Sequence, residues 1–461
     1  MEQFDVAVLG AGGAGENIAR PLAQAGKRVV LIEEGRIGGT CPFVACVPSK
    51  VMLRSAEVRL LLRRAHELGA SAAPVELGDG RAAYAAAVQR RRRLVPNNDA
   101  DGERMLAEAG VTLLRGRGTI VRPGVLAVGV REIAWRDLVI STGSAPIVPP
   151  VSGLGAVPVW TSDEALTSDK LPASLAILGG GPVGCELAQI FAAFGTAVSI
   201  VEVAPRLLPS EEPAIGDLLG TVLTGDGVCL RLGAELKSAQ HTDAGARLTL
   251  ADGAPIETER VLIATGRKPR VEEIGLEALG IRPGKQGIAI DQHCRVLGQA
   301  HVWAAGDAAG IDPFTHTAEY QANVITANLL GGSDAADYRA IPRMVYTSPP
   351  VAAVGLTRAE AEQRGLRVVS AGADLADTPR AETAGTELGR LELLADVERG
   401  VLIGAAAIGE QADSWLGEAL LAIQAETPLD RLVRVVHAFP TYNQIYDQAV
   451  PQLLQQVSGV E

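Results

Sequence analysis

Residues 6–33, VAVLGAGGAGENIARPLAQAGKRVVLIE, carry the most informative pattern for predicting the architecture of the chain. An apolar run at its start predicts a buried strand, and the turn that follows carries Gly10, Gly12 and Gly15. A helix is predicted after this turn, and a second apolar strand after the helix ends in Glu33. This order of strand, glycine turn, helix, strand and acidic residue predicts a unit that binds a dinucleotide.

The glycines and the acid of this unit each have a physical purpose. Gly10 permits the tight turn, Gly12 lets the backbone approach a pyrophosphate, and Gly15 allows the helix to pack closely on the strand. The helix N-terminus offers unpaired N–H donors to the pyrophosphate. The carboxylate of Glu33 is then placed to reach the ribose hydroxyls of an adenosine.

The same unit recurs at residues 174–202, SLAILGGGPVGCELAQIFAAFGTAVSIVE. Its turn carries Gly179, Gly181 and Gly184, and its second strand ends in Glu202, which lies 23 positions after the first glycine, as in the first copy. A single glycine turn is weak evidence, because such turns also occur for structural reasons. Two complete copies predict two dinucleotide cofactors in one chain, with electrons moving between them.

The acid of the second unit bears on the choice of nicotinamide cofactor. Glu202 would repel a 2′-phosphate, so the sequence favours NADH over NADPH. Arg206 follows four residues later and could partly compensate for that repulsion, although a solvated loop charge is the simpler interpretation. Use of NADPH therefore stays open.

Length and charge narrow the class of protein. At 461 residues the chain should form roughly three domains. A net charge of −12 disfavours nucleic acid and anionic membranes as partners. The basic run from Arg90 to Arg93 is interpreted as the solvated end of a helix that begins near Arg81.

The acidic N-terminus does not resemble a secretion signal, and no uninterrupted apolar stretch of about 20 residues occurs. We therefore expect a cytoplasmic protein that does not span a membrane.

The segment GGTCPFVACVPSK, residues 38–50, directly follows the first unit and holds Cys41 and Cys46. In a regular helix, residues five apart have Cα atoms about 8.6 Å apart, beyond the ~7 Å that a disulfide can bridge. Pairing of these cysteines therefore requires a distorted helical turn, to which Pro42 and the position before Pro48 contribute. A strained, accessible disulfide is readily reduced, so the pair is a candidate redox centre. The alternatives are two buried small hydrophobic side chains or a zinc site, for which no second pair of ligands stands nearby.

Three other short apolar runs end in glycine turns, at residues 138–143, 261–266 and 301–306. We expect each to form a short buried strand. The third is followed by Asp307, whose carboxylate could hydrogen-bond the sugar-like chain of a flavin or simply cap a helix.

The pattern of the chain changes from about Ile341. Strands are expected over residues 351–354, 389–394 and 401–407, and a helix over residues 414–423. Because this part has no glycine fingerprint, we expect an assembly domain.

Together these segments resemble the class I flavoprotein disulfide reductases, the group of dihydrolipoamide dehydrogenase, glutathione reductase and mercuric reductase. The resemblance covers nearly the whole chain, and the segment around Cys41 and Cys46 is its most specific part. It implies an α/β fold with two Rossmann-like dinucleotide-binding domains, for FAD and NAD(P), and an α+β C-terminal dimerisation domain that makes a homodimer. The implied domains are residues 1–148 with 268–338 for FAD, residues 149–267 for NAD(P), and residues 339–461 for dimerisation.

The resemblance also implies which residues contact each cofactor. For FAD these are Gly10, Gly12, Gly15, Glu33, Gly39, Thr40, Thr142, Gly143, Asp307 and His316, the last lying beside the flavin without a catalytic role. For NAD(P)H these are Gly179, Gly181, Gly184, Glu202 and Gly266.

Four residues would form the redox centre by the same resemblance. Cys46 would be the sulfur next to the flavin, and Cys41 the outer thiol that attacks a substrate. Lys50 and Glu186 would form an ion pair near the flavin N5 atom. That pair is physically sensible, because a buried lysine needs a partner and a cation stabilises reduced, anionic flavin.

One segment departs from the family pattern, which ends in His-x-His-Pro-Thr-x-x-Glu with the second histidine as acid/base on the partner subunit. Here Phe439 stands at that histidine position and Gln444 at the glutamate position. Phe439 cannot move a proton, so reduction of a lipoamide-type disulfide would lose help worth about 10²–10⁴-fold. Tyr442 is a candidate substitute donor, whereas His437 is interpreted as a packing or capping residue. Mercuric reductases also lack the histidine and use a nearby tyrosine, but they carry a C-terminal cysteine pair that residues 455–461 lack.

We therefore expect an FAD-containing, NAD(P)H-dependent oxidoreductase that passes electrons through flavin to Cys41 and Cys46. A dithiol without its proton donor fits an acceptor that needs electrons or thiolates more than protons. A soft metal ion, a quinone or a small disulfide is expected as that acceptor. Two alternatives stay open: a dihydrolipoamide dehydrogenase-like disulfide reductase with another base, and a catalytically retired flavoprotein that acts as a redox sensor or binding partner.

Overall fold

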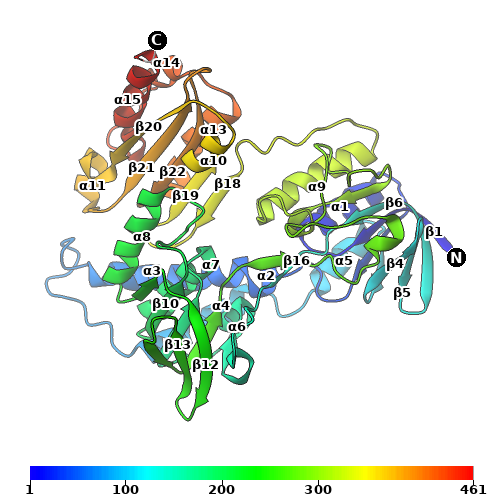
Figure 1. The fold of residues 1–461 in the computed structure, drawn as a ribbon, viewed down its shortest axis with the longest axis horizontal. Helices are drawn as coiled ribbons and strands as arrows, with labels where there is room; N and C mark the ends of the chain where they lie inside the picture. Colours follow the sequence, from blue (N-terminus) through cyan, green and yellow to red (C-terminus); the bar gives the residue numbers. More distant parts are fainter. Residues whose placement is uncertain (460–461) are drawn as a thin grey trace. The chain divides into compact units, whose positions relative to one another are not determined.

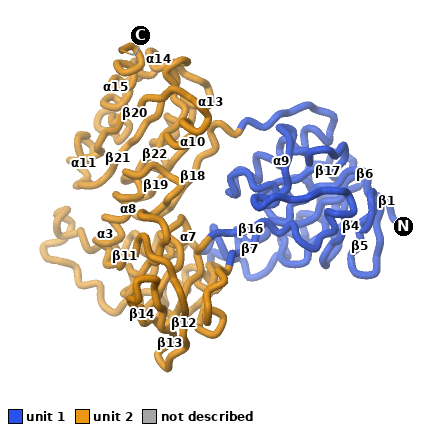
Figure 2. Tube along the Cα trace, in the orientation of Figure 1, with its two compact units in different colours: residues 1–48, 92–147, 266–337 blue, residues 49–91, 148–265, 338–461 orange. Residues whose placement is uncertain are grey.

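The computed structural model describes residues 1–459, so Val460 and Glu461 of the cysteine-free tail lie outside the described residues. The chain divides into two compact units (Figure 2). Unit 1 comprises residues 1–48, 92–147 and 266–337, and unit 2 comprises residues 49–91, 148–265 and the chain from 338 onward. The expected division into three domains stays a prediction. Within residues 1–459, none of the helices combines the length and apolar character that a transmembrane span requires.

Unit 1 is built on a seven-stranded sheet (Figure 1). Its strands are β1 (Glu2–Leu9), β2 (Val29–Glu33), β3 (Thr112–Arg115), β4 (Gly118–Arg122), β5 (Val125–Val128), β6 (Arg131–Ile140) and β17 (Val302–Ala304). They run in the order β3-β2-β1-β6-β5-β4, and β17 pairs with β6 off this path. The pairs among β3, β2, β1, β6 and β17 are parallel, whereas β4, β5 and β6 pair antiparallel. Two further strands, β7 (Ser144–Pro146) and β16 (Arg267–Pro269), pair with each other.

The first glycine unit forms the centre of this sheet. β1 and β2 are nearly continuous apolar runs because helices and loops cover both of their faces. Helix α1 (Gly13–Gln24) buries one stripe of small and aliphatic side chains, and α9 (Thr315–Leu329) packs beside it on the same core. Helix α5 (Ala100–Glu108) adds to that core through Leu106.

The cysteine segment forms two helices instead of one. Helix α2 (Cys41–Val44) is followed by Ala45, whose φ of −132° and ψ of −98° are not helical, and α3 (Cys46–Arg63) begins at the next residue. The helical path is therefore interrupted between the two cysteines, as the sequence predicts.

Unit 2 repeats the strand, turn and helix order on a parallel sheet. Its strands are β8 (Val159–Trp160), β9 (Ser174–Leu178), β10 (Ala197–Glu202), β11 (Cys229–Leu232) and β15 (Arg260–Ile263), in the order β11-β10-β9-β15-β8. The accompanying helices are α6 (Ser162–Thr167), α7 (Pro182–Ala193) and α8 (Pro213–Gly225). A three-stranded antiparallel sheet of β12 (Leu236–Thr242), β13 (Gly245–Leu250) and β14 (Pro255–Thr258) follows.

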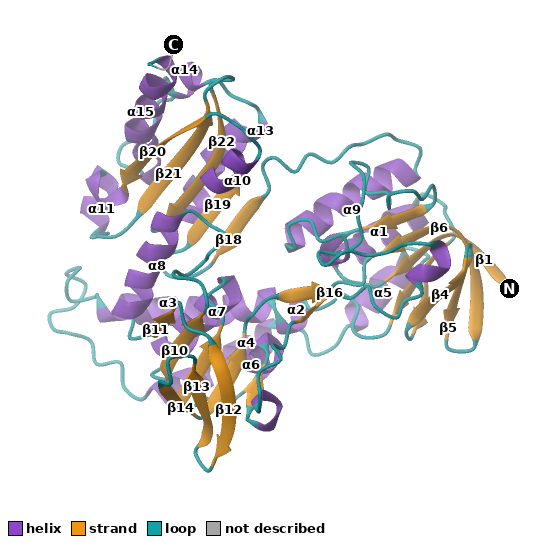
Figure 3. Cartoon of the chain, in the orientation of Figure 1, coloured by secondary structure: helices purple, strands orange, loops and turns teal. Residues whose placement is uncertain are grey.

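The C-terminal part of unit 2 is a five-stranded antiparallel sheet with helices packed on it (Figure 3). Its strands are β18 (Pro342–Val345), β19 (Val351–Gly355), β20 (Val368–Asp374), β21 (Arg390–Asp396) and β22 (Val401–Ile408), in the order β18-β19-β22-β21-β20. Its helices are α10 (Arg358–Gln363), α11 (Pro379–Ala384), α12 (Ala412–Trp415), α13 (Gly417–Gln424), α14 (Leu429–Leu432) and α15 (Tyr446–Ser458). The three expected strands are present, but the expected helix over 414–423 is broken at Leu416 between α12 and α13.

The interpretation of the arginine run as solvated is wrong for Arg91. It lies in α4 (Gly80–Leu94), but its side chain is buried at 7% exposure. Its guanidinium donates to the carbonyls of Thr167 and Ser168 at 3.0 Å and pairs with Asp169 at 3.1 Å. Arg91 is buried because its planar donors satisfy the carbonyls at the end of α6.

Candidate functional site

The first glycine turn forms an open cradle at the N-terminus of α1. Gly10 has a φ of +101°, and a Cβ there would collide with the carbonyl oxygen of Ser141. A Cβ at Gly15 would collide with the carbonyl oxygen of Gly10. At Gly12, in contrast, no described atom lies within 4 Å of the Cβ position. The turn is therefore tightly packed at Gly10 and Gly15. It is open at Gly12, where a pyrophosphate would approach.

The acid of the first unit is tied to the backbone of this turn. Glu33 accepts hydrogen bonds from the N–H groups of Ala11 and Gly35, both at 2.6 Å. With Gly10 and Thr142 it also lines a cavity of about 340 Å³. The cradle and the cavity fit the pyrophosphate and adenosine of FAD, which these residues would hold.

The other residues expected beside FAD lie in the same unit, just after the end of β6, in a short 3-10 helix (Gly306–Ala308) and at the start of α9. Asp307 accepts a hydrogen bond from the Ser144 hydroxyl, and this hydroxyl accepts one from Arg267 Nε at 2.8 Å. Gly143 accepts a backbone hydrogen bond from residue 270 at 2.8 Å. Gly266, which is expected to contact NAD(P)H, also belongs to unit 1 and accepts one from residue 147 at 3.0 Å. His316 is exposed at the start of α9, where its ring stacks on residue 314 at a centroid distance of 5.2 Å.

Cys41 and Cys46 lie together beside the first turn of α9. The hydroxyl oxygen of Thr315 lies 3.5 Å from each sulfur. A hydrogen bond with Cys46 and burial raise the pKa of the Cys41 thiol, and the hydrogen bond from Thr315 offsets part of this rise. Gly39 lies against Gly12, whose Cα is 3.0 Å from the position of a Cβ at Gly39, so the segment that carries the dithiol touches the cradle.

Thr40 stands at the N-cap of α2, directly before the dithiol. Its carbonyl accepts hydrogen bonds from the N–H groups of residues 43 and 44 at 3.2 and 2.9 Å, whereas its hydroxyl does not cap the helix. The contact of Thr40 with FAD stays a prediction.

The second glycine turn has the same construction. Gly179 has a φ of +110°, and Cβ atoms at Gly179 and Gly184 would collide with the carbonyl oxygens of Ala264 and Gly179. Gly181 is as open as Gly12, with no described atom within 4 Å of its Cβ position. The turn therefore fits the pyrophosphate of a second dinucleotide.

The acid of the second unit is buried beside its turn. Glu202 accepts hydrogen bonds from the N–H groups of Gly180 at 2.6 Å and Ala204 at 2.7 Å. Arg206 is half-buried and donates to the carbonyl of Pro209 at 3.3 Å. Its Nε is buried with no hydrogen-bond partner among the described residues. Arg206 is thus only partly the solvated loop charge that the sequence suggests.

The predicted ion pair of Lys50 and Glu186 is present within unit 2. The Lys50 ammonium lies 3.0 and 2.8 Å from the two carboxylate oxygens of Glu186. Glu186 is held within α7, where residues 184–193 are all buried, and it also accepts the backbone N–H of Tyr346 at 2.9 Å. The role of the pair at a flavin stays a prediction.

The segment that departs from the family pattern lies at the surface of unit 2. Phe439 is 75% exposed. The Tyr442 hydroxyl is directed into the protein, 3.1 Å from the Thr386 hydroxyl oxygen. Burial raises the pKa of Tyr442, a hydrogen bond with Thr386 opposes this, and one with Glu410 adds to it. A catalytic role for Tyr442 stays a prediction, which this environment disfavours.

His437 packs between two carboxylates, in agreement with its interpretation as a packing residue. Its Nδ1 lies 2.7 Å from Asp447, and its Nε2 lies 3.0 Å from both oxygens of Glu418. Burial alone would lower the pKa of His437, but the hydrogen bonds with Asp447 and Glu418 outweigh it and raise the pKa.

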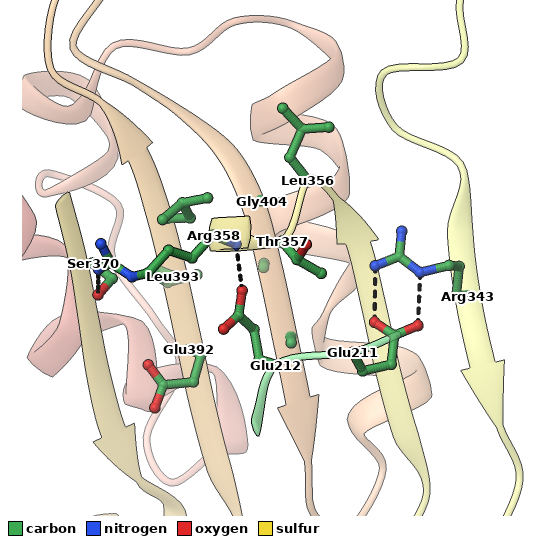
Figure 4. Close-up of a pocket in the computed structure, with 13 residues that line it drawn as sticks. Glu211, Glu212, Arg343, Leu356, Thr357, Arg358, Ser370, Glu392, Leu393 and Gly404 are labelled. Atoms are coloured by element: carbon green, nitrogen blue, oxygen red, sulfur yellow. Dashed lines mark hydrogen bonds and ion pairs between the residues drawn. The ribbon is translucent and has the colours of Figure 1, made fainter. Parts of the chain in front are cut away.

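A second, smaller cavity of about 30 Å³ lies where the loop before α8 meets the C-terminal sheet (Figure 4). Glu211 pairs with Arg343 through two hydrogen bonds of 2.8 and 2.9 Å, and Glu212 accepts the backbone N–H of Arg358 at 2.6 Å. Because the protein itself binds the carboxylates of Glu211 and Glu212, we interpret this cavity as a packing feature between the loop and the sheet and not as a ligand site.

Sequence reasoning missed two residues that contact the predicted redox residues. Thr315 reaches both cysteines, and Tyr346 contacts both members of the Lys50–Glu186 pair. Each lies more than 150 positions from the residues that it contacts, so no local pattern marks it.

Comparisons with known proteins show the family of the chain. The sequence model of the pyridine nucleotide-disulphide oxidoreductases matches residues 4–322, and that of their dimerisation domain matches residues 341–450. The chain is 33% identical over 439 residues to mercuric reductase of Acidithiobacillus ferrooxidans, covering 94% of this chain and 79% of that protein. It is 32% identical over 462 residues to dihydrolipoyl dehydrogenase of Halobacterium salinarum, covering 98% and 96%.

A solved structure gives the same result. The Cu(II) complex of the HOCl-induced flavoprotein disulfide reductase RclA from Escherichia coli superimposes with a TM-score of 0.84 at 27% identity, covering 97% of this chain and 99% of that one. The α/β fold, the use of FAD and NAD(P)H, and the oxidoreductase class are therefore confirmed. The chain belongs to the pyridine nucleotide-disulphide oxidoreductase family.

Proposed function

We propose that this chain uses NADH and FAD to reduce the pair Cys41 and Cys46, which then passes electrons to a soft metal ion such as Hg(II) or Cu(II). The observation that carries the proposal is a retained dithiol combined with Phe439, an exposed side chain that cannot transfer a proton. Thiolates are the ligands that soft metal ions prefer. Reduction of a metal ion also needs no proton delivered to a leaving thiol, so it tolerates the loss of an acid/base residue.

The named relatives support a metal ion over a disulfide as acceptor. Mercuric reductases of Acidithiobacillus ferrooxidans and Shigella flexneri are 33% and 34% identical to this chain, and the E. coli neighbour was solved with Cu(II). Dihydrolipoyl dehydrogenases are almost as similar, which keeps a small disulfide as the second candidate.

In the proposed reaction, the two sulfurs take up and release equal numbers of electrons and protons. The first glycine turn and Glu33 would hold FAD, which would supply the transfer of two electrons from NADH to the sulfur pair. The disulfide of Cys41 and Cys46 takes up these two electrons and two protons and becomes the dithiol. Binding of a metal ion displaces both protons, and the sulfurs return to the disulfide as two electrons reduce one Hg(II) to Hg(0) or two Cu(II) to two Cu(I). Thr315 orients both sulfurs, which its hydroxyl contacts at 3.5 Å.

NADH is proposed as the preferred nicotinamide cofactor because of Glu202. Its carboxylate is fixed by two backbone N–H groups at the end of β10, where a 2′-phosphate would meet a negative charge. We also propose a homodimer, which the matched dimerisation domain supports.

The test is anaerobic reduction of the purified yellow protein by NADH, followed by a panel of acceptors. Flavin bleaching and a long-wavelength thiolate-to-flavin band are expected, followed by rapid reoxidation with Hg(II) or Cu(II). Cys41→Ser should abolish this reoxidation, while Cys229→Ser, which alters an exposed cysteine on β11, should not.

Other outcomes would assign a different function. Rapid turnover with lipoamide and none with metal ions would contradict the proposal and favour a disulfide reductase. Rapid turnover with a quinone alone would favour a quinone reductase. A flavin that NADH does not reduce would favour a retired flavoprotein.

A further inference from the structure

Tyr346 contacts both members of the Lys50–Glu186 ion pair. The Lys50 ammonium lies over the ring of Tyr346, 4.6 Å from its centroid. The backbone N–H of the same residue donates to the Glu186 carboxylate at 2.9 Å. One residue at the end of β18 therefore holds the cation with its ring and the anion with its backbone.

The ring contact adds to the ion pair with Glu186 in limiting the motion of the ammonium. The Lys50 side chain is 39% exposed, whereas that of Glu186 is only 9% exposed. Glu186 is fixed within the buried α7 and by a backbone donor, but Lys50 has a flexible four-carbon stem that can turn toward solvent. The negative face of an aromatic ring attracts an ammonium and disfavours such excursions.

We propose that Tyr346 is a positioning residue of the redox centre, whose ring keeps the Lys50 ammonium in one place while its backbone keeps the Glu186 carboxylate in place. The proposal rests on the proposed function and on the predicted place of the Lys50–Glu186 pair beside the flavin, where Lys50 would offset the charge of reduced flavin. Because the backbone donor survives any substitution except proline, variants of Tyr346 isolate the contribution of the ring.

The contact itself is tested by the reactivity of the Lys50 amine, which does not depend on catalysis. The FAD-loaded protein is treated with formaldehyde and borohydride, and methylation of Lys50 is quantified by mass spectrometry against Lys237, a 57% exposed lysine of the same unit. Tyr346→Leu should raise the ratio of Lys50 to Lys237 methylation about two- to fivefold, the range of an exposed cation–π contact. Tyr346→Phe should keep the wild-type ratio, because it keeps the ring.

The functional consequence is tested on the flavin. Tyr346→Leu should lower the rate constant for flavin reduction by NADH about two- to fivefold and shift the flavin midpoint potential to more negative values. Tyr346→Phe should keep the rate constant and the midpoint potential at their wild-type values. Trp160→Leu is the matched control, since it removes a ring under Arg260 at 5.6 Å in the same unit and should leave the Lys50 methylation and the potential unchanged.

Each outcome decides the proposal. Unchanged methylation in Tyr346→Leu overturns the contact, and raised methylation with an unchanged potential and rate overturns the positioning role. If Tyr346→Phe changes the reduction rate and the potential as much as Tyr346→Leu does, the effect belongs to the hydroxyl group, and the proposed role of the ring is overturned. If NADH does not reduce the wild-type flavin, the proposed function fails, whereas the methylation ratio still reports whether the ring holds Lys50.

Discussion

The two glycine turns have almost the same backbone. The residues that cap their helices, Gly12 and Gly181, have φ and ψ of −72° and −173° and of −77° and −176°. In both units the carboxylate that ends the second strand accepts two backbone N–H groups, one from the glycine turn and one from two residues beyond the acid. The same spacing of glycines and acid therefore gives the same local structure twice.

The surroundings of the two turns differ. Helix α1 buries a single stripe, and Glu33 is half-buried beside a cavity of about 340 Å³. Helix α7 is buried along residues 184–193, and Glu202 is buried. The local pattern thus sets the shape of each turn, while the packing around each helix decides which further contacts its residues make, such as those of Glu186 in α7.

The largest expected effect comes from adding one methyl group at the third glycine of each turn. Gly15→Ala and Gly184→Ala would each press a Cβ onto a backbone carbonyl, at a cost of about 1–3 kcal/mol or more. Gly15→Ala should purify with little FAD, whereas Gly184→Ala should keep FAD and bind NADH weakly. Flavin absorbance per chain and NADH titration measure this.

A control separates cofactor loss from general instability. Gly225→Ala adds a Cβ at a helical position with no described atom within 4 Å and should change neither property. Equal loss of FAD in Gly15→Ala and Gly184→Ala would show that the two turns do not hold different cofactors.

The second prediction compares the carboxylates at the start of each glycine helix. Glu186→Gln weakens the bond to Lys50, and hydrogen bonds between charged groups are worth about 1.5–3 kcal/mol. Flavin reduction by NADH should slow roughly tenfold or more in stopped-flow measurements. Glu16→Gln in α1 should leave this rate within about twofold of wild type, and a similar loss in both variants would mean that α7 has no special role.

The third prediction concerns the acids that end the second strands. Glu202→Gln removes a negative charge, a change of about 1 kcal/mol, so the preference for NADH over NADPH should fall about fivefold. The ratio of kcat/KM for the two nucleotides measures this preference. Glu33→Gln should leave the ratio unchanged while weakening FAD retention, and an altered ratio in that variant would contradict the assignment of the two turns.

The smallest expected effect is a pH dependence of stability at Glu16 in α1. Burial raises the pKa of Glu16 above its ordinary value of 4.5, Arg20 opposes the rise, and Asp99 adds to it. The folded state then holds the proton of Glu16 more tightly than the unfolded state does. The contribution of Glu16 to the free energy of unfolding therefore falls as pH rises above 4.5. Glu16→Gln should therefore gain free energy of unfolding relative to wild type as pH rises toward neutral, as measured by urea denaturation. A difference that is independent of pH would contradict this.

Several features of the site follow from nearby residues and could be predicted. Each glycine turn and its acid lie within 23 positions, and the break between Cys41 and Cys46 follows from the spacing and the prolines around them. The burial of Arg91 could not be predicted, because charge runs are usually solvated and its partners at 167–169 lie in another helix and loop. The break at Leu416 was also missed, because the apolar periodicity continues across it.

The two glycine units, the cysteine segment and the family could all be inferred from the amino-acid sequence, because glycine conformation, helix termini and residue spacing act over short distances. Only the tertiary structure placed Thr315 against the two sulfurs and Tyr346 against Lys50 and Glu186. Such contacts join residues that lie far apart in the chain, and they arise from the packing of whole strands and helices, which no local pattern encodes.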